Sequence, residues 1–118
     1  MYKILDKIED VSDLKKIDKK DLEELASEIR EVLLKKLSIH GGHFGPNFGM
    51  VEAIIAMHYV FNSPIDKIVF DVSHQSYTHK ILTGRKQAFI DSNHYDDVTG
   101  YTNPSESNHD LFNVGHTS

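Results

Sequence analysis

Histidine is the residue type in this 118-residue sequence best suited to chemistry near neutral pH, and all eight copies lie from His40 onward. Imidazole titrates near pH 6.5 and is also a common metal ligand, so both roles are candidates. Two glycines separate His40 from His43, and on a helix His74 and His79 would point about 140° apart. Neither spacing matches a zinc site, and cysteine is absent. The histidines therefore predict no metal centre.

Three histidines occupy places where a side chain can meet a ligand. His43 follows Gly42, His116 follows Gly115, and His74 stands just after an apolar, strand-like run. Backbone amides at such places help to hold a ligand. We expect His58 to be a core or interface histidine, because it lies within an apolar helix. His94 and His109 are interpreted as loop residues without a role.

The stretch "VFDVSHQSYTHKILTGR", residues 69–85, is the most unusual in the chain. An apolar run leads through Asp71 directly into hydrogen-bonding side chains, without the Gly, Pro or Asn that normally ends a core strand. So dense a polar set at this place indicates a bound ligand. Helical spacing in the same stretch turns His79 away from His74, so we expect His79 to contribute less.

The elements that must position these residues begin with an amphipathic helix over residues 21–37. Its apolar side chains recur at three- and four-residue steps, and its charges form a solvated face to which no chemistry is assigned. Four glycines and a proline in residues 38–49 then predict a break in the helix. Residues 50–61 are apolar on nearly every side, which predicts a helix that is buried all round and needs partners.

The sequence pattern in the second half of the chain predicts one strand and one long loop. Residues 67–70 are the only convincing strand, and the chain returns to helix from His74 until Gly84 stops it. Residues 91–110 have the composition of an ordered loop that lines a site. Together these elements predict an α/β fold.

Bulk composition excludes several classes of function. The net charge of −5 argues against nucleic-acid binding, which relies on a basic surface. No apolar run approaches the roughly 18 residues of a membrane span. The absence of cysteine fits a reducing compartment. We therefore expect a soluble, cytoplasmic protein with neither a nucleic-acid nor a membrane partner.

Three strings in the sequence resemble one family of enzymes. They are "GGHFGPNFG", "VEAIIAMHYVFNSPIDKIVFDVSHQSYTHKILTGR" and "ESNHDLFNVGHTS". Together they resemble the N-terminal region of the 1-deoxy-D-xylulose-5-phosphate synthases, thiamine-diphosphate enzymes of the transketolase-like group. The resemblance covers residues 22–118, and its most specific part is "DVSHQSYTHKILTGR". It implies an α/β fold, of which this chain is the helix-rich, incomplete N-terminal part of a doubly wound, thiamine-diphosphate-binding domain.

The resemblance also implies roles for particular residues. His74 matches a histidine that contacts thiamine diphosphate, beyond the carboxyl end of the strand at residues 67–70. Gly115, His116 and Thr117 match a Gly-His-Ser segment that lines the cofactor. His43 matches a histidine near the reacting carbon, which assists substrate binding and proton transfer.

The sequence departs from the family pattern at several positions. Ser73 stands where glycine is usual, and Thr117 stands where serine is usual. Residues 99–107 replace a stretch that is usually richer in glycine and contains an arginine, which leaves the identity of the aldehyde acceptor open. The family's magnesium ligands and its activating glutamate are expected beyond Ser118. Lys80 and Arg85 are the only nearby cations that could face a diphosphate.

Two functional interpretations follow. In the first, residues 1–118 form a partial diphosphate-side domain of the synthase, with a charged extension at residues 1–20. The whole enzyme is then a homodimeric transferase that condenses pyruvate with glyceraldehyde 3-phosphate, releases carbon dioxide, and uses thiamine diphosphate and magnesium in isoprenoid and thiamine precursor synthesis. The segment alone is expected to be inactive. In the alternative, the chain is a non-catalytic or paralogous module that acts in assembly or on another aldehyde.

Overall fold

The computed structural model describes residues 2–41, 45–70 and 75–112, and helices are the only regular elements within these ranges. In chain order they are η1 Leu5–Lys7, α1 Val11–Leu14, η2 Lys19–Asp21, α2 Leu22–His40, α3 Gly45–Gly49, α4 Val51–Val60, α5 Tyr77–Lys80, η3 Ile81–Arg85, α6 Gln87–Ile90 and η4 Ser92–Asp97. The helix-rich character expected of the chain is confirmed.

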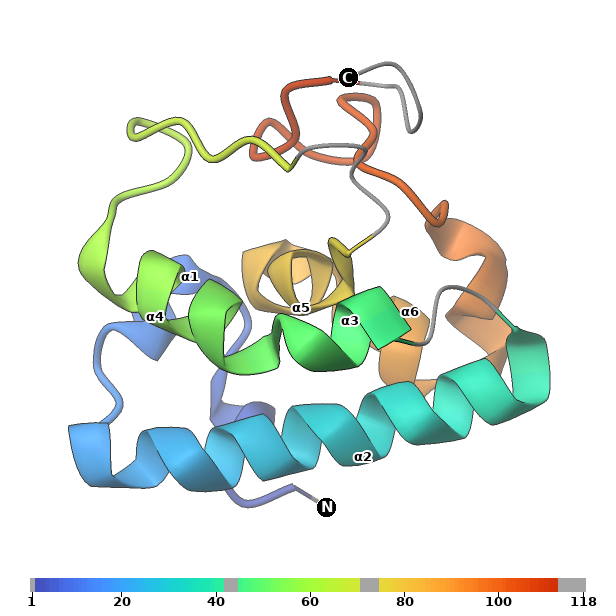
Figure 1. Ribbon diagram of the computed structural model, residues 1–118, viewed down its shortest axis with the longest axis horizontal. Coiled ribbons are helices and arrows are strands. Elements are labelled where there is room, and N and C mark those ends of the chain that lie inside the picture. Colours follow the sequence, from blue (N-terminus) through green and yellow to red (C-terminus); the bar gives the residue numbers. More distant parts are fainter. Residues whose placement is uncertain (1, 42–44, 71–74, 113–118) are drawn as a thin grey trace.

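Helix α2 forms the base of the molecule, and the other elements lie along one side of it (Figure 1). Leu25, Ile29 and Leu33 are completely buried at the spacing of one helix face, so the predicted helix at residues 21–37 is confirmed. The helix continues to His40. It ends where Gly41 takes a φ of 88°, which glycine adopts without strain, and donates its N–H to the carbonyl of Leu37 at 3.0 Å.

The first twenty residues contribute to the core, although their charges led us to expect an extension. Ile4, Leu5 and Ile8 are almost fully buried. The backbone N–H groups of Ile4 and Leu5 donate to the carboxylate of Glu28, at 3.0 and 2.7 Å to Oε1. Glu28 is only 8% exposed, so it is not part of the solvated face that was predicted for its helix.

Helix α4 follows the predicted span closely, but the prediction that it is buried all round is wrong for this chain. Val51, Ile54, Ile55 and His58 point into the core between α2 and α5. The opposite face is open, and Val60 at its end is 68% exposed. The described residues cover only one side of α4, because they are too few to enclose a helix of uniformly apolar surface.

One prediction about local structure is also wrong. Lys67–Phe70 forms no strand within the described ranges, because an isolated strand has no neighbour to receive its backbone hydrogen bonds. The break predicted in residues 38–49 is confirmed where α2 ends at His40, and the chain returns to a short helix at Gly45–Gly49. A proline in a first helical turn needs no N–H partner, so Pro46 is compatible with this helix despite its flanking glycines.

Candidate functional site

The five site residues predicted from the sequence lie outside the described residues, so the structure does not test them. They are His43, His74, Gly115, His116 and Thr117. The departures at Ser73 and Thr117 lie outside them as well. The site can be built only from the described segments that lead to these residues.

Helix α5 carries the polar stretch that follows His74 in sequence, and it runs through the centre of the molecule (Figure 1). Ser76, Thr78, His79 and Lys80 are all completely buried. The helix begins where the N–H of Tyr77 donates to Oδ1 of Asn47, at 2.9 Å. It is broken after one further turn by Gly84, whose φ is 96°, so the predicted stop at Gly84 is confirmed.

His79 is the centre of a buried hydrogen-bond network. Its Nε2 lies 2.9 Å from Oδ1 of Asp110, and its Nδ1 lies 2.8 Å from Nε2 of His58. Burial lowers the pKa of His79 although Asp110 opposes this, and burial also lowers the pKa of His58 to about 3. Both rings are therefore neutral at pH 7. His58 donates to His79, which in turn donates to Asp110, and His58 is confirmed as a core histidine.

Asp110 receives hydrogen bonds on both of its oxygens. Arg85 donates to Oδ1 at 2.9 Å and to Oδ2 at 2.8 Å, and the N–H of Asn103 donates to Oδ2 at 2.8 Å. Burial alone would raise the pKa of Asp110, but the hydrogen bonds from His79 and Arg85 hold it well below its usual range. The carboxylate therefore remains charged throughout the neutral range.

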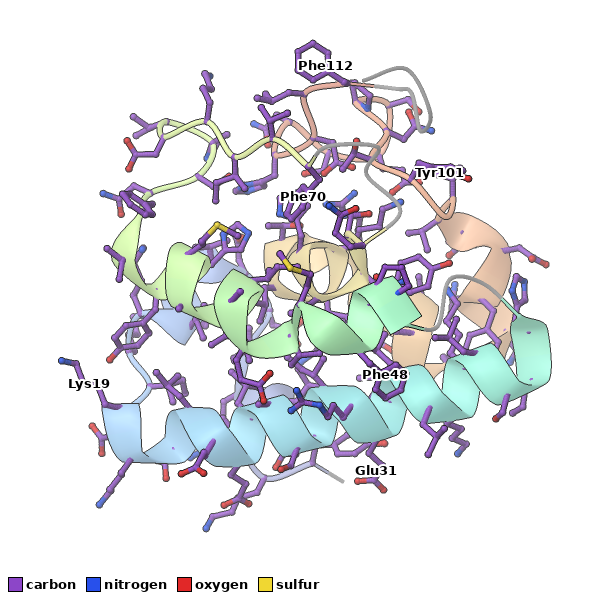
Figure 2. The ribbon with its side chains drawn as sticks, viewed as in Figure 1. Lys19, Glu31, Phe48, Phe70, Tyr101 and Phe112 are labelled. Atoms are coloured by element: carbon purple, nitrogen blue, oxygen red, sulfur yellow. The ribbon has the colours of Figure 1, made fainter. Side chains whose placement is uncertain are left out.

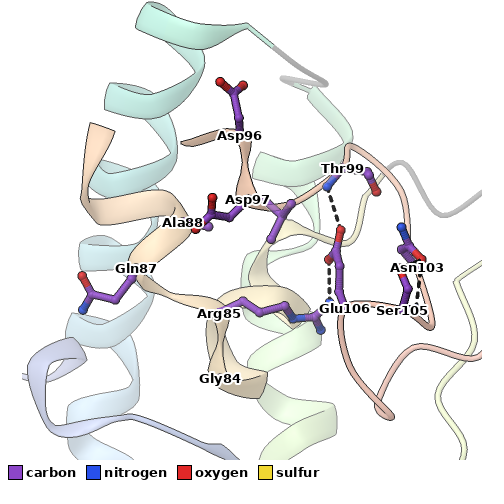
Figure 3. Close-up of a pocket in the computed structure, with 11 residues that line it drawn as sticks. Gly84, Arg85, Gln87, Ala88, Asp96, Asp97, Thr99, Asn103, Ser105 and Glu106 are labelled. Carbon is purple, nitrogen blue, oxygen red and sulfur yellow. Dashed lines mark hydrogen bonds and ion pairs between the residues drawn. The ribbon is translucent and has the colours of Figure 1, made fainter. Parts of the chain in front are cut away.

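A second buried carboxylate, Glu106, lies next to this pair. It is 2.9 Å from NH1 of Arg85 and accepts from the N–H of Thr99 at 2.8 Å (Figure 3). It also lies 3.0 Å from Nζ of Lys80. Lys80 also donates to the carbonyls of Thr99 and Tyr101, at 2.7 and 2.6 Å. Both cations that could have faced a diphosphate are thus engaged inside the protein.

We call the six side chains His58, His79, Lys80, Arg85, Glu106 and Asp110 the buried network. Sequence reasoning missed it, because His79 was set aside and neither acid was singled out. One signal was present: the sequence has no Lys or Arg after Lys86, while Glu106 and Asp110 remain. Lys80 and Arg85 flank the apolar residues Ile81 and Leu82, where a buried cation requires an acidic partner.

A pocket of about 460 Å³ opens beside the network, between η3 and the segment after η4 (Figure 3). Arg85 and Glu106 line it, but both already hold charged partners. Asp96 and Asp97 line it as well, and they are mostly exposed. Their negative charge repels anions, so the pocket does not suit a diphosphate.

The remaining described histidines lie at the surface or at its edge. His40 pairs with Asp96 at 2.5 Å, and His94 pairs with Asp97 at 2.7 Å, which raises the pKa of His94. His109 contacts Ser63 Oγ at 2.8 Å. Among the described residues, no three His, Asp or Glu side chains are placed to share a metal ion. No described helix is long and apolar enough to cross a membrane.

Comparison with known proteins assigns this helical segment to a family of longer proteins. Residues 5–118 match the model of a family described as 1-deoxy-D-xylulose-5-phosphate synthase. Curated synthases of that name from Caldanaerobacter subterraneus subsp. tengcongensis and Corynebacterium jeikeium are 49% and 52% identical to it over 115 residues. Each alignment covers 98% of this chain and 18% of the relative.

A third relative, the synthase of Francisella philomiragia subsp. philomiragia, is 50% identical over 117 residues, which is 99% of this chain and 19% of the relative. The chain thus spans about a fifth of the length of its relatives and corresponds to an N-terminal segment of a large synthase. It belongs to the 1-deoxy-D-xylulose-5-phosphate synthase family.

Proposed function

We propose that this chain is the cofactor-contacting N-terminal part of an enzyme that condenses pyruvate with glyceraldehyde 3-phosphate and releases carbon dioxide. The product would serve isoprenoid and thiamine precursor synthesis. The observation that carries the proposal is the family match over residues 5–118, at about half identity to synthases of that name. The quoted motif at residues 71–85 supports it, because a long polar string at the end of an apolar run is hard to explain without a ligand.

Thiamine diphosphate is the cofactor that the resemblance implies, and when bound it supplies the carbanion stabilisation that decarboxylation requires. His74, Gly115, His116 and Thr117 would hold it. His43 would assist substrate binding and move a proton near the reacting carbon, a role suited to a group that titrates close to neutral pH.

One feature of the described residues fits a polar group bound close to α5. The hydroxyl groups of Ser76 and Thr78 are buried and have no hydrogen-bond partner in the described part of the chain. Such groups are costly unless something satisfies them. The charge of a diphosphate is a separate requirement: Lys80 and Arg85 are already paired, so we expect magnesium to neutralise it, held by residues outside this chain.

The proposed domain is doubly wound, and this chain supplies part of it. Residues Lys67–Phe70 would join a sheet formed with the rest of the enzyme. The open face of α4, with Val60 and Phe61 exposed, would pack against further protein. We assign part of that contact to a second copy, since the resemblance implies a homodimer.

The test is a cofactor titration of the full-length synthase that carries this segment, with pyruvate decarboxylation as a second readout. Replacing His74 with Ala removes one hydrogen bond to a charged group, so affinity for thiamine diphosphate should fall about ten- to a hundredfold. His94→Ala is the matched control, because His94 is exposed and paired only with acids of its own segment. Unchanged affinity in the His74 variant, or no binding by the unmodified enzyme, would contradict the proposal.

A further inference from the structure

The buried network joins two segments that lead toward the proposed cofactor contacts. Phe70 is the last described residue before His74, and its ring centroid lies 4.9 Å from that of His79. Asp110 lies two residues before Phe112, the last described residue before His116. Figure 2 shows Phe70 and Phe112 on the side of the molecule away from α2.

Chain length limits how far the proposed contacts can lie from this network. An extended chain covers at most about 3.5 Å per residue, and only four residue steps separate Phe70 from His74 and six separate Asp110 from His116. The two segments are far apart in sequence, and His79 and Asp110 themselves are separated by 31 residues. The position of one proposed contact relative to the other therefore depends on a tertiary link.

Asp110 supplies such a link and has no capacity left for a ligand. A carboxylate offers about four lone-pair sites. Those of Asp110 are taken by His79, by both terminal nitrogens of Arg85 and by the N–H of Asn103, at 2.8 to 2.9 Å. Hydrogen bonds to a buried carboxylate are directional, so they fix the position of residue 110 more narrowly than apolar packing would.

The segment on either side of Asp110 is held in the same way. Thr102 Oγ1 donates to the carbonyl of Phe112 at 2.8 Å, and Ser63 Oγ lies 2.8 Å from His109 Nδ1. On the other side of the link, Thr83 Oγ1 donates to the carbonyl of His79 at 2.6 Å. The chain that leaves at Phe112 is therefore fastened to the element that carries His79.

We propose that His79 and Asp110, with Arg85, are positioning residues for the thiamine diphosphate site: they set the relative placement of the two segments that carry its contacts, and they do not touch the cofactor. This inference rests on the proposed function. It assigns His79 a larger part than its position in the sequence indicated.

The experiment compares four variants of the full-length synthase by calorimetric titration with thiamine diphosphate and magnesium. Asp110→Asn keeps the size of the side chain but replaces one accepting oxygen with an NH₂ group, which cannot accept from Arg85. Its matched control is Glu106→Gln, which alters an acid of the same network whose side chain is 9% exposed and which pairs with Lys80 and Arg85 rather than with His79. We expect at least a tenfold loss of affinity in Asp110→Asn and less than a threefold loss in Glu106→Gln.

A second pair of variants tests the hydrogen bond itself. Gln at position 79 can still donate to Asp110, whereas Leu cannot. We expect His79→Gln to stay within threefold of the unmodified affinity and His79→Leu to lose at least tenfold. If Asp110→Asn does not fold, the two variants at position 79 test the positioning role by themselves. Urea unfolding without cofactor measures whether these two variants are equally stable.

Two results would overturn the inference. One is unchanged affinity in folded Asp110→Asn and His79→Leu. The other is an equal loss of affinity in each variant and its control at matched stability, which would show that the loss does not come from the hydrogen bonds of His79 and Asp110. Affinity that falls in His74→Ala but not in the network variants removes this inference alone. Failure of the unmodified enzyme to bind the cofactor removes the proposed function with it.

Discussion

The two halves of this chain bury charge in different ways. Beside α2, buried cations donate to backbone carbonyls: Lys36 donates to Ala88 and Tyr95, at 2.9 and 3.2 Å, and Lys86 donates to Leu5 at 3.0 Å, while its ion-pair partner Glu9 is 73% exposed. In the buried network, Lys80 and Arg85 are paired with the carboxylates of Glu106 and Asp110 instead. Both arrangements join segments that are distant in sequence, but the first can use any backbone carbonyl, whereas the second needs particular acidic side chains.

This difference indicates how narrowly each region fixes the positions of its side chains. Apolar burial is non-directional, so the α2 core tolerates small shifts of its side chains. A network of hydrogen-bonded charges specifies one arrangement, and it is strongly destabilised when a single member is lost. The half that leads toward the proposed cofactor contacts is the half in which positions are fixed most narrowly.

The largest effect on stability is expected from Asp110→Ala. This change leaves the guanidinium of Arg85 and Nε2 of His79 buried without their acceptor. Removing one partner of a buried pair costs about 3–5 kcal/mol. Urea unfolding monitored by circular dichroism measures the loss. A cost below about 1 kcal/mol would mean that water replaces the carboxylate, and the contrast between the two halves would then disappear.

Leu33→Ala tests the apolar half at a completely buried position of α2. We expect a loss of about 2–5 kcal/mol from lost burial and the cavity that remains. The neighbouring Leu34 is 52% exposed, so Leu34→Ala is the control and should change the unfolding free energy by less than about 0.5 kcal/mol. Similar losses in both variants would show that α2 does not present the face described above.

Acid should lower the stability that the region around His58 and His79 contributes. Burial is the largest cause that lowers the pKa of His58 to about 3, below its ordinary value of 6.5. Below pH 6.5 the unfolded chain therefore binds more protons than the folded chain, and stability falls as pH decreases toward 3. We expect a loss on the order of 1 kcal/mol per pH unit from this group.

The check is the unfolding free energy measured between pH 7 and pH 5 for the unmodified chain and for His58→Gln. Glutamine can keep the donor to His79 but does not titrate, so the slope should decrease. It should not vanish, because burial also lowers the pKa of His79. An unchanged slope in the variant would assign the acid sensitivity to other groups.

The smallest effect is expected at the surface, where Arg30 of α2 pairs with Glu52 of α4. Their side chains are 37% and 61% exposed, and exposed pairs of this kind contribute about 0.2–1 kcal/mol. A double-mutant cycle with Arg30→Ala and Glu52→Ala measures the coupling, which should decrease further in high salt. Coupling above 2 kcal/mol would mean that ion pairing matters equally in both halves.

Local sequence signals predicted the helices well and the environment of α4 poorly. The spans expected at residues 21–37 and 50–61 are found as Leu22–His40 and Val51–Val60, because helical periodicity is a property of neighbouring residues. The burial of α4 depends on other elements that pack against it, and a strand at residues 67–70 depends on a neighbouring strand. The described residues supply too few such partners. His43, His74, Gly115, His116 and Thr117 remain predictions.

The sequence by itself determined helices α2 and α4, the breaks at Gly41 and Gly84, and the family, since each depends on residues close together along the chain. Only the tertiary structure decided which histidine meets which acid. His58, His79 and Asp110 are 21 and 31 residues apart, and their contacts form only when α4, α5 and the segment before Phe112 pack together. Burial then removes the water that would otherwise satisfy these groups, so each must find its partner inside the protein.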